Sequence, residues 1–174
     1  MPTTVDDDED LLGDILSGGR GTRLDDALVY DKTVVNTVAA FQSSSEVGGQ
    51  FIVVGIVDDL TLPKAKAKIE KQLTKFGKKP PTDAELKRAR RGIRSDLLYS
   101  LEDAADRAEV LVDCLRLNGD PNCAAAEYAR YGAVTADDVM RVYREYLVPE
   151  HLTTLSVVPT DDTGMLEGAQ EVEI

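Results

Sequence analysis

The 174-residue sequence contains little of several things: one histidine, two cysteines, no tryptophan, 5% aromatic residues, and 20 basic residues against 32 acidic ones. The net charge of −12 argues against a protein that binds nucleic acid or an anionic membrane surface. No apolar run approaches the ~18 residues that a membrane span requires. The first residues, MPTTVDDDED, lack the basic and apolar regions of a signal peptide, and we expect the chain to be a piece of something longer.

What the chain does contain is ordinary globular material. Hydrophobic residues, chiefly Leu, Val, Ala and Ile, make up 43% of a length that fits one domain. Positive charge is concentrated in residues 64–94, which hold twelve basic and three acidic side chains. The net of +9 in this segment leaves −21 for the rest of the chain. Such a basic stripe could contact a polyanion, but solvated helix faces explain it at least as well.

Short local signals predict where helices begin. A serine or threonine followed three residues later by an acidic residue is typical of a helix start, and we expect capping boxes at Thr22 with Asp25 and at Thr82 with Glu85. The pairs are Thr22 with Asp25, Thr82 with Glu85, Ser100 with Asp103, and Thr135 with Asp138. Acidic residues 6–10 favour an earlier helix start, and apolar residues recur at helical spacing over 62–76 and 86–115. We expect a break in the second stripe, at the Ser100 signal.

Three β-rich runs predict strands. Residues 34–42 and 50–59 should form neighbouring antiparallel strands, and residues 153–159 a closing strand. The predicted order α-α-β-β-α-α-α-α-α-β indicates an α+β fold, in which helices cover an antiparallel sheet. We expect one domain over residues 1–159, followed by a polar, flexible tail over residues 160–174.

The glycine-rich stretch SGGRGTR, residues 17–23, raises the question of a phosphate-binding loop. Such a loop needs Gly-x4-Gly-Lys-Ser/Thr after a buried strand, so that amides at a helix N-terminus surround the phosphate. Here a helix precedes the glycines and the lysine is missing. We therefore interpret Gly18 and Gly19 as a tight corner between two helices, where Arg23 can form a stabilising ion pair.

The corner and the segments after it resemble the second half of a domain repeat in the pitrilysin/insulinase-type zinc metallopeptidases. The similarity rests on the segments DILSGGRGTRLDDALVYDK, VVNTVAAFQSS and GGQFIVVGIV, and then, in order, on PTDAELKRARRGIRSDLLYSLEDAADRAEVL, NGDPN and AVTADDVMRVYREYLVPEHLTTLSVVP. It extends from about residue 8 to residue 159. No single motif is decisive, but the ordered set is specific.

The resemblance implies a parent protein whose two halves close around a peptide, each half made of two similar α+β domains. In that family the zinc site belongs to the first domain and uses His-x-x-Glu-His, with a more distant glutamate as third ligand. This chain cannot form the motif, because His151 is its only histidine. We therefore expect no metal or other cofactor in this chain, no catalytic residues, and zinc in the missing catalytic half.

The resemblance also points to two substrate-binding positions. The family's non-catalytic half often contributes an arginine and, seven positions later, a tyrosine that hold the substrate backbone near zinc. Tyr30 and Thr37 occupy those places here, so the arginine is absent and Thr37 lacks the phenol. Both residues can face the substrate chamber, and packing or partner contact is the alternative. The pairs Glu9/Asp10 and Glu102/Asp103 are interpreted as helix-start charges rather than as acid/base pairs.

Cys114 and Cys123 are too few for a zinc cage and have no histidine partner. Their spacing closes a hairpin of two helices around NGDP, which could bring the two sulfurs together. A disulfide would fit an exported parent, periplasmic or secreted, rather than a cytoplasmic one. Two free, half-buried thiols are the alternative.

Three functional hypotheses follow. The first is the non-catalytic C-terminal domain of a zinc metalloendopeptidase, which forms a wall of the peptide chamber and packs on the zinc-bearing half. The second is a separate non-catalytic partner subunit of a heterodimeric protease of the same family. The third is a binding module that uses the basic stripe. Under the first two, the chain alone should cleave no peptide, and it should contact neither nucleic acid nor membrane.

Overall fold

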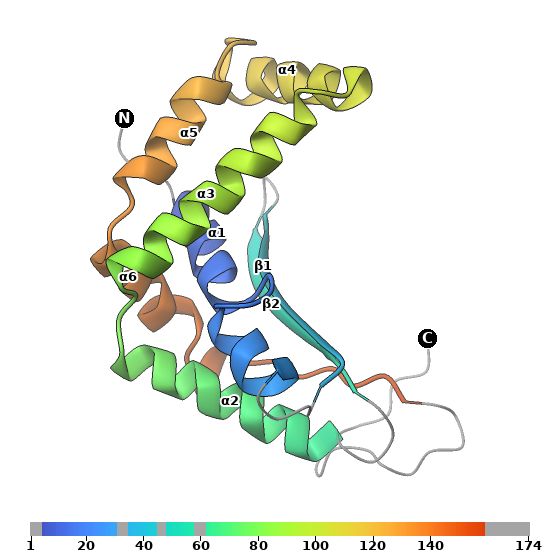
Figure 1. Ribbon diagram of the computed structural model, residues 1–174, viewed down its shortest axis with the longest axis vertical. Coiled ribbons are helices and arrows are strands. Elements are labelled where there is room, and N and C mark those ends of the chain that lie inside the picture. The colour runs from blue at the N-terminus through green and yellow to red at the C-terminus, as the bar shows by residue number, and fades with distance from the viewer. Residues whose placement is uncertain (1–4, 31–34, 45–47, 58–61, 159–174) are drawn as a thin grey trace.

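The computed structural model describes residues 5–30, 35–44, 48–57 and 62–158, and in these ranges helices cover one side of a two-stranded antiparallel sheet (Figure 1). The elements in chain order are α1 (Val5–Leu16), η1 (Asp25–Tyr30), β1 (Thr37–Ser44), β2 (Gly49–Ile56), α2 (Leu62–Lys78), α3 (Asp83–Ser100), α4 (Ala104–Asn118), α5 (Ala124–Ala133), α6 (Ala136–Tyr146) and η2 (Pro149–His151). This is the α+β fold that the sequence predicts. The predicted tail, residues 160–174, lies outside the described residues.

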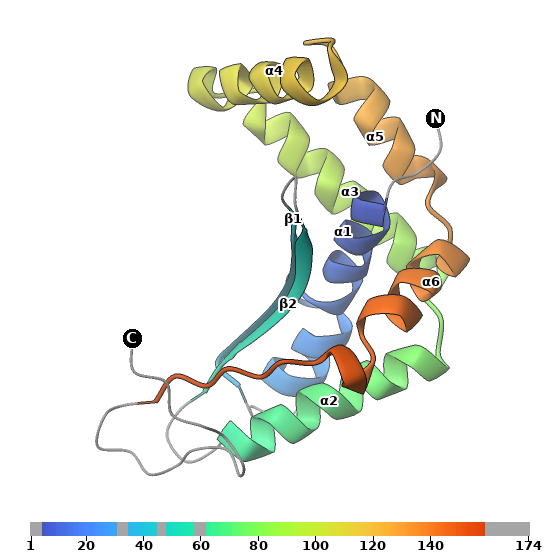
Figure 2. The ribbon, with the colours of Figure 1, turned by 180° about the vertical axis from the view of Figure 1, so that it is seen from behind.

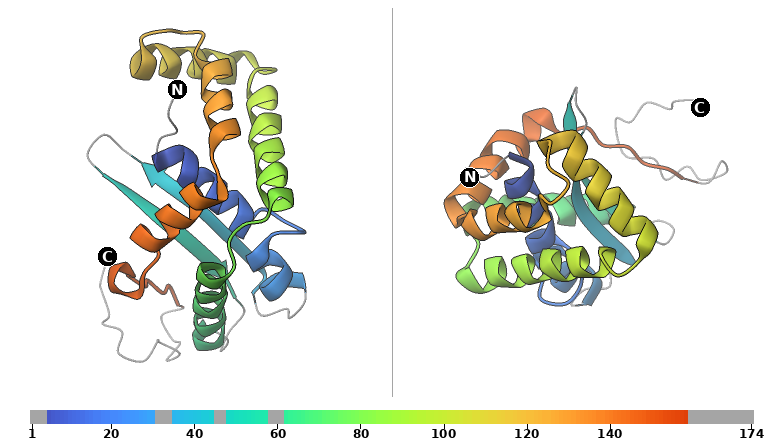
Figure 3. Two further views of the ribbon diagram at one scale, coloured as in Figure 1. Left: turned by 90° about the vertical axis from the view of Figure 1, so that its left-hand side faces the viewer. Right: turned by 90° about the horizontal axis from the view of Figure 1, so that it is seen from above.

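Helix α1 is the centre of the fold. It contacts β1, α3, α5 and α6, and two further views place it in the middle of the molecule (Figure 3). Its core residues are fully buried: Leu11, Leu12, Ile15 and Leu16. A Cβ on Gly13 would lie 2.8 Å from the carbonyl oxygen of Ala40 in β1, so only glycine allows this close approach. The Ser17 hydroxyl then satisfies both the amide and the carbonyl of Ala40.

The two strands pair as predicted, in an antiparallel register from Thr37↔Ile56 to Ser44↔Gly49. Successive side chains of a strand point to opposite faces of the sheet. On one face, Val38 and Ala40 are buried against α1. The sheet therefore contributes only one of its two faces to the core.

Most of the predicted helix ends are confirmed. Thr82 and Thr135 form complete capping boxes with Glu85 and Asp138. The expected break separates α3 from α4, but the predicted Ser100 cap is not formed: Ser100 ends α3, and its hydroxyl donates to the carbonyl of Leu97. Asp103 caps α4 instead, and its carboxylate accepts hydrogen bonds from the amides of residues 105 and 106. These signals act within three residues of the helix start, which is why the sequence alone reveals them.

One predicted helix cap takes another form. Thr22 and Asp25 do not form a capping box that opens an α-helix. Instead, the Asp25 carboxylate accepts hydrogen bonds from the Thr22 hydroxyl and the Gly18 amide, at 2.8 and 3.1 Å. The segment from Asp25 is a π-helical turn, η1. Asp25 therefore stabilises the preceding glycine corner by accepting these hydrogen bonds.

The prediction of a closing strand is wrong for the residues that the structure describes. Residues 152–158 form no strand, and Leu155 and Val157 are 79% and 85% exposed. A β-rich sequence becomes a strand only when a neighbour offers hydrogen bonds, and neither β1 nor β2 pairs with this segment. Residue 159 lies outside the described residues.

Seen from behind, the described elements curve around the sheet (Figure 2). Helix α4 crosses one end of the molecule, and the segment 152–158 runs along the other end. Among the described residues, no helix combines the length and the apolar character needed to cross a bilayer.

Candidate functional site

No element of the described residues covers the face of the sheet that points away from α1, and we call it the open sheet face. Its side chains, in paired order, are Thr37 and Ile56, Ala39 and Val54, Phe41 and Ile52, and Ser43 and Gln50. Phe41, Val54 and Ile56 are 45%, 43% and 57% exposed. A contiguous exposed apolar surface of this kind marks an interaction site. The open sheet face is therefore a candidate contact surface.

Gly18 and Gly19 form the corner between α1 and η1, with φ angles of +116° and +114° that favour glycine. The amides of Gly18 and Gly21 donate hydrogen bonds to the carboxylates of Asp25 and Asp26, at 3.1 and 3.0 Å. A phosphate bound at this corner would have to displace both carboxylates.

Arg23 connects this corner to the start of α3. Its guanidinium binds Glu85 at two points, with N–O distances of 2.7 and 3.0 Å. It also donates to the carbonyls of Lys79 and Pro80 and lies 4.4 Å from the centre of the Phe76 ring. The hydrogen bonds from Arg23 are the main reason that the pKa of Glu85 is lowered to about 2. Arg23 therefore joins η1, the end of α2 and the start of α3.

Tyr30 and Thr37 end η1 and begin β1. Tyr30 is 44% exposed, and the Arg20 guanidinium lies 4.6 Å from its ring centre. Thr37 lies on the open sheet face, opposite Ile56. The residues between them, 31–34, lie outside the described residues. The role of Tyr30 and Thr37 in substrate binding stays a prediction.

Cys114 and Cys123 form a disulfide at the turn between α4 and α5, with their Cα atoms 5.3 Å apart and both residues buried. Asn118 donates hydrogen bonds to the Cys123 sulfur and to Glu127. Over the described ranges, the two sulfurs and Glu127 are the only cluster of potential metal ligands. Zinc binds thiolates, and a disulfide offers none. The redox state of the pair in the cell stays a prediction.

His151 lies exposed in η2, with its Nδ1 atom 3.1 Å from the carbonyl oxygen of Glu145. A zinc peptidase site of the expected type needs two histidines on one helix face. Because the sequence has a single histidine, this chain cannot supply that site.

The sequence explains the acidic residues of α1 only as helix-start charges, and the structure shows that this interpretation is incomplete. Asp7, Asp8 and Glu9 are 2%, 0% and 8% exposed. Arg130 of α5 lies 3.1 Å from Asp7, and Arg141 of α6 lies 2.6 Å from Asp8. These pairs span more than 120 residues, so no local signal in the sequence could have revealed them.

Two further carboxylates of α1, those of Asp10 and Asp14, belong to half-buried residues. The Asp10 carboxylate accepts a hydrogen bond of 2.7 Å from the Tyr131 hydroxyl. Burial raises the pKa of Asp10, and it raises that of Asp14 to about 6. Helix α1 is therefore apolar toward the sheet and acidic toward α3, α5 and α6.

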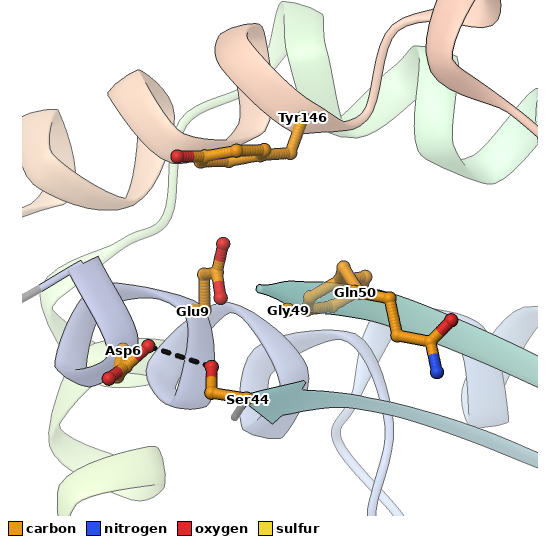
Figure 4. Close-up of a pocket in the computed structure, with 7 residues that line it drawn as sticks. Asp6, Glu9, Ser44, Gly49, Gln50 and Tyr146 are labelled. Carbon is orange, nitrogen blue, oxygen red and sulfur yellow. Dashed lines mark hydrogen bonds between the residues drawn. The ribbon is translucent and has the colours of Figure 1, made fainter. Parts of the chain in front are cut away.

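A cavity of about 150 Å³ opens between the N-terminal end of α1, the hairpin end of the sheet and the C-terminal end of α6 (Figure 4). The lining residues are Asp6, Glu9, Ser44, Gly49, Gln50, Phe51 and Tyr146. The Ser44 hydroxyl lies 2.9 Å from an Asp6 carboxylate oxygen and 2.6 Å from the side-chain oxygen of Gln42. The Glu9 carboxylate points into the space below the Tyr146 ring. We call this cavity the α1–α6 pocket.

Comparison with protein-family models shows to which family the chain belongs. Residues 7–93, half of the sequence, match the model of the peptidase M16 inactive domain. The chain therefore belongs to the M16 peptidase family as an inactive domain, which confirms the resemblance to the pitrilysin/insulinase-type zinc metallopeptidases. A search of curated proteins found no significant match.

Solved structures share the fold. The inactive peptidase domain of a presumed zinc protease from Bordetella parapertussis superposes with a TM-score of 0.74 at 24% identity, over 92% of this chain and 88% of that one. A presumed zinc protease from Bordetella pertussis Tohama I gives 0.66 at 24% identity, over 85% and 82%. The periplasmic protease PqqL from Escherichia coli gives 0.57 at 15% identity, over 84% of this chain and 16% of that one. The fold thus also occurs as a small part of a longer protease chain.

Proposed function

We propose that this chain is the non-catalytic C-terminal domain of a zinc metalloendopeptidase. In this role it forms a wall of the peptide chamber and packs on the half that carries zinc. The observation that carries the proposal is the open sheet face: Phe41, Val54 and Ile56 are exposed together, while the opposite face of the same two strands is buried. A one-sided sheet offers an extended apolar surface to a peptide or a second domain.

The residue content of the chain supports a non-catalytic role. Peptide hydrolysis on zinc needs about three protein ligands and an open position for water. The sequence offers one imidazole, and its two cysteines are joined. The peptide and the zinc-bearing half are therefore the partners that the proposal requires, and zinc belongs to the other half.

Two observations favour an exported parent. The Cys114–Cys123 disulfide is of the kind that persists in oxidising compartments. The structural relative PqqL is periplasmic. We place the parent protein in the periplasm or outside the cell on these grounds.

An experiment on the reconstituted protease tests the proposal. The purified chain is mixed with the His-x-x-Glu-His-bearing half, and chelator-sensitive cleavage of an unstructured peptide library is followed. We expect no new peptide termini from the chain alone and cleavage from the mixture. Phe41→Asp, on the open sheet face, should lower the activity of the mixture at least tenfold. Leu117→Asp on α4, where Leu117 is 63% exposed, is the matched control and should change it less than twofold.

Two results would overturn the proposal: chelator-sensitive cleavage by the chain alone, or equal activities of the two variants. The second candidate, a separate non-catalytic subunit, makes the same surface prediction, because it too must pack on a zinc-bearing partner. It is favoured if denaturing electrophoresis of the native protease shows this domain on a chain that carries no His-x-x-Glu-His.

A further inference from the structure

The α1–α6 pocket contains a carboxylate, that of Glu9, with no partner among the described residues. Glu9 is 8% exposed, and within the described residues it accepts no hydrogen bond and forms no ion pair. Its carboxylate points into the pocket below the Tyr146 ring (Figure 4). Among the described residues, Asp8 Oδ1 is the only buried side-chain oxygen without a hydrogen-bond partner, so the Glu9 oxygens stay accessible from the pocket. A carboxylate in a mostly buried side chain with no counter-charge is less well stabilised than in water, and it can accept hydrogen bonds from a guest.

The surroundings of Glu9 add to this cost. Burial raises the pKa of Glu9, and its nearest charged neighbours raise it further; they are Asp6, Asp10, Asp8 and Glu145. The nearby cation, Arg141, is engaged by Asp8 at 2.6 Å and by Glu145 at 3.7 Å. The pocket therefore has a negative potential that no basic side chain of the described chain cancels at Glu9.

Asp6 adds a second carboxylate on the same wall. The Ser44 hydroxyl carries one hydrogen, and it lies within reach of both Asp6 and Gln42. Asp6 therefore keeps acceptor capacity for a guest. Across the pocket, Tyr146 presents its ring above Glu9 (Figure 4). Two carboxylates on one side and an aromatic face on the other are the two groups that bind an organic cation, by charge-assisted hydrogen bonds and by cation–π contact.

We propose that the α1–α6 pocket binds an organic cation: a guanidinium or ammonium group, as carried by an arginine or lysine side chain or by a peptide amino terminus. A volume of about 150 Å³ is several times the ~30 Å³ of one water, so a side-chain head group fits. A divalent metal ion fits less well. It needs several oxygen ligands that converge, and no three carboxylates of the described residues converge here.

The same chemistry already joins other parts of the molecule. Arg20 lies over Tyr30, and Arg23 lies over Phe76 while it binds Glu85. At Arg23 the cation, the ring and the carboxylate come from the chain itself. In the α1–α6 pocket the ring and the carboxylates are present, and the guest supplies the cation. The inference does not depend on a role in proteolysis, since it concerns only this chain's own side chains.

The test is a titration of the purified, isotope-labelled chain, followed by the amide NMR signals of Glu9, Gln50 and Tyr146. The probes are N-acetyl-arginine amide, N-acetyl-lysine amide, N-acetyl-citrulline amide as the neutral isostere of arginine, glycinamide as a model of a peptide amino terminus, and calcium chloride. We expect the arginine probe to bind at least tenfold more tightly than the citrulline probe. Tighter binding of glycinamide than of the arginine probe would assign the same cationic site to a peptide amino terminus rather than to a side chain.

Two variants locate the binding. Glu9→Gln keeps the shape and removes the charge, and should weaken the best-binding cation at least tenfold. Tyr146→Leu removes the ring at a residue that is 40% exposed, so folding should be preserved, and it should weaken the same cation severalfold. Glu109→Gln on the exposed surface of α4 is the matched control and should bind like the unmodified chain.

Three outcomes would overturn the inference. In the first, no cationic probe binds more tightly than citrulline. In the second, neither Glu9→Gln nor Tyr146→Leu alters the affinity. In the third, only calcium chloride shifts the three amide signals, which would make the pocket a metal site.

Discussion

Two arginine–carboxylate junctions hold the helices together, and their carboxylates respond in opposite directions. At the corner, Arg23 lowers the pKa of Glu85 to about 2. Between α1 and α6, Arg141 approaches Asp8 to 2.6 Å, yet the pKa of Asp8 is raised to about 6. A short contact between opposite charges therefore does not by itself keep the pKa of a carboxyl group low.

The difference lies in hydrogen-bond donors and burial. Glu85 accepts two hydrogen bonds from Arg23 and others from the amide and hydroxyl of Thr82, and its side chain keeps 18% exposure. Asp8 is fully buried, and its Oδ1 atom accepts no hydrogen bond within the described residues. Burial is the largest cause of its shift, and the charge of Asp138 adds to it. Desolvation outweighs the single contact with Arg141.

The largest expected effect comes from removing the arginine at the corner. Arg23→Met keeps an apolar stem over Phe76 but removes the positive charge and two hydrogen bonds from Glu85, which keeps only its bonds from Thr82. It also removes the side-chain donor to the carbonyls of Lys79 and Pro80. We expect the free energy of unfolding to fall by about 3 kcal/mol, measured by urea denaturation. Lys66→Met is the control, because the Lys66–Glu70 pair is 36% and 40% exposed and should contribute less than about 1 kcal/mol. Equal losses of unfolding free energy in the two variants would show that Arg23 contributes no more than an exposed ion pair does.

The Cys114–Cys123 disulfide joins α4 and α5 covalently. Its contribution to stability therefore does not depend on the hydration of charges, unlike that of the two arginine–carboxylate pairs. Replacing Cys114 and Cys123 together by serine should destabilise the domain by about 2–3 kcal/mol through the loss of a short closed loop. Reductant should produce a similar loss in the unmodified chain and none in the double variant. Two alkylated thiols in freshly purified protein, found by mass spectrometry without reductant, would contradict the oxidised state.

The sequence predicts the features that have local causes, and it does not predict the arginine–carboxylate pairs. The capping boxes at Thr82 and Thr135 act over three residues, and both are confirmed. The glycine corner and the antiparallel hairpin likewise have local causes. The partner of Arg23, in contrast, lies 62 residues away, and that of Asp8 lies 133 residues away. Their pairing depends on how the helices pack, which no spacing in the sequence encodes.

The same reason explains the other surprises. The acidic first turns of α1 are typical of a solvated helix start, and only the docking of α5 and α6 buries them. The β-rich run of residues 153–159 predicts a strand, but strand formation needs a paired neighbour, and the described part of this run has none. The Glu9 site follows from the meeting of α1, α6 and the hairpin end, so it was visible only in three dimensions.

The pH dependence of stability should separate the two junctions. A carboxyl group whose pKa is raised in the folded state destabilises the fold above that pKa, and the penalty disappears as the pH falls. Asp8 and Asp14 both have a pKa of about 6, against an ordinary value of 3.8. Lowering the pH from 7.5 to 5 should therefore stabilise the domain by about 1–2 kcal/mol.

Glu85 acts in the opposite sense. Its stabilising contribution is complete above its ordinary pKa of 4.5 and is lost as the pH falls towards about 2. Urea denaturation at a series of pH values should show two limbs of the stability curve. In the upper limb, stability rises as the pH falls from 7.5 to 5; in the lower limb, it falls again as Glu85 becomes protonated. Asp8→Asn should reduce the upper limb by about half, because Asp14 still titrates, and should leave the lower limb unchanged. A stability curve that falls steadily from pH 7.5 to pH 5 would contradict the raised pKa values.

The smallest expected effect concerns the backbone of the corner that Arg23 holds. Gly19 has a φ of +114°, and a Cβ added there would meet no atom within 4 Å. The cost of Gly19→Ala therefore comes from backbone conformation alone, and we expect a loss of about 1 kcal/mol in urea denaturation. Gly132→Ala is the matched control. Gly132 lies in α5 with open space around its Cβ position and no positive φ, so alanine should stabilise the helix by about 0.5–1 kcal/mol. If Gly19→Ala also stabilises the domain, the left-handed corner is not its solution conformation. The position of Arg23 relative to Glu85 would then need another explanation, because the glycine turn that precedes Arg23 sets that position.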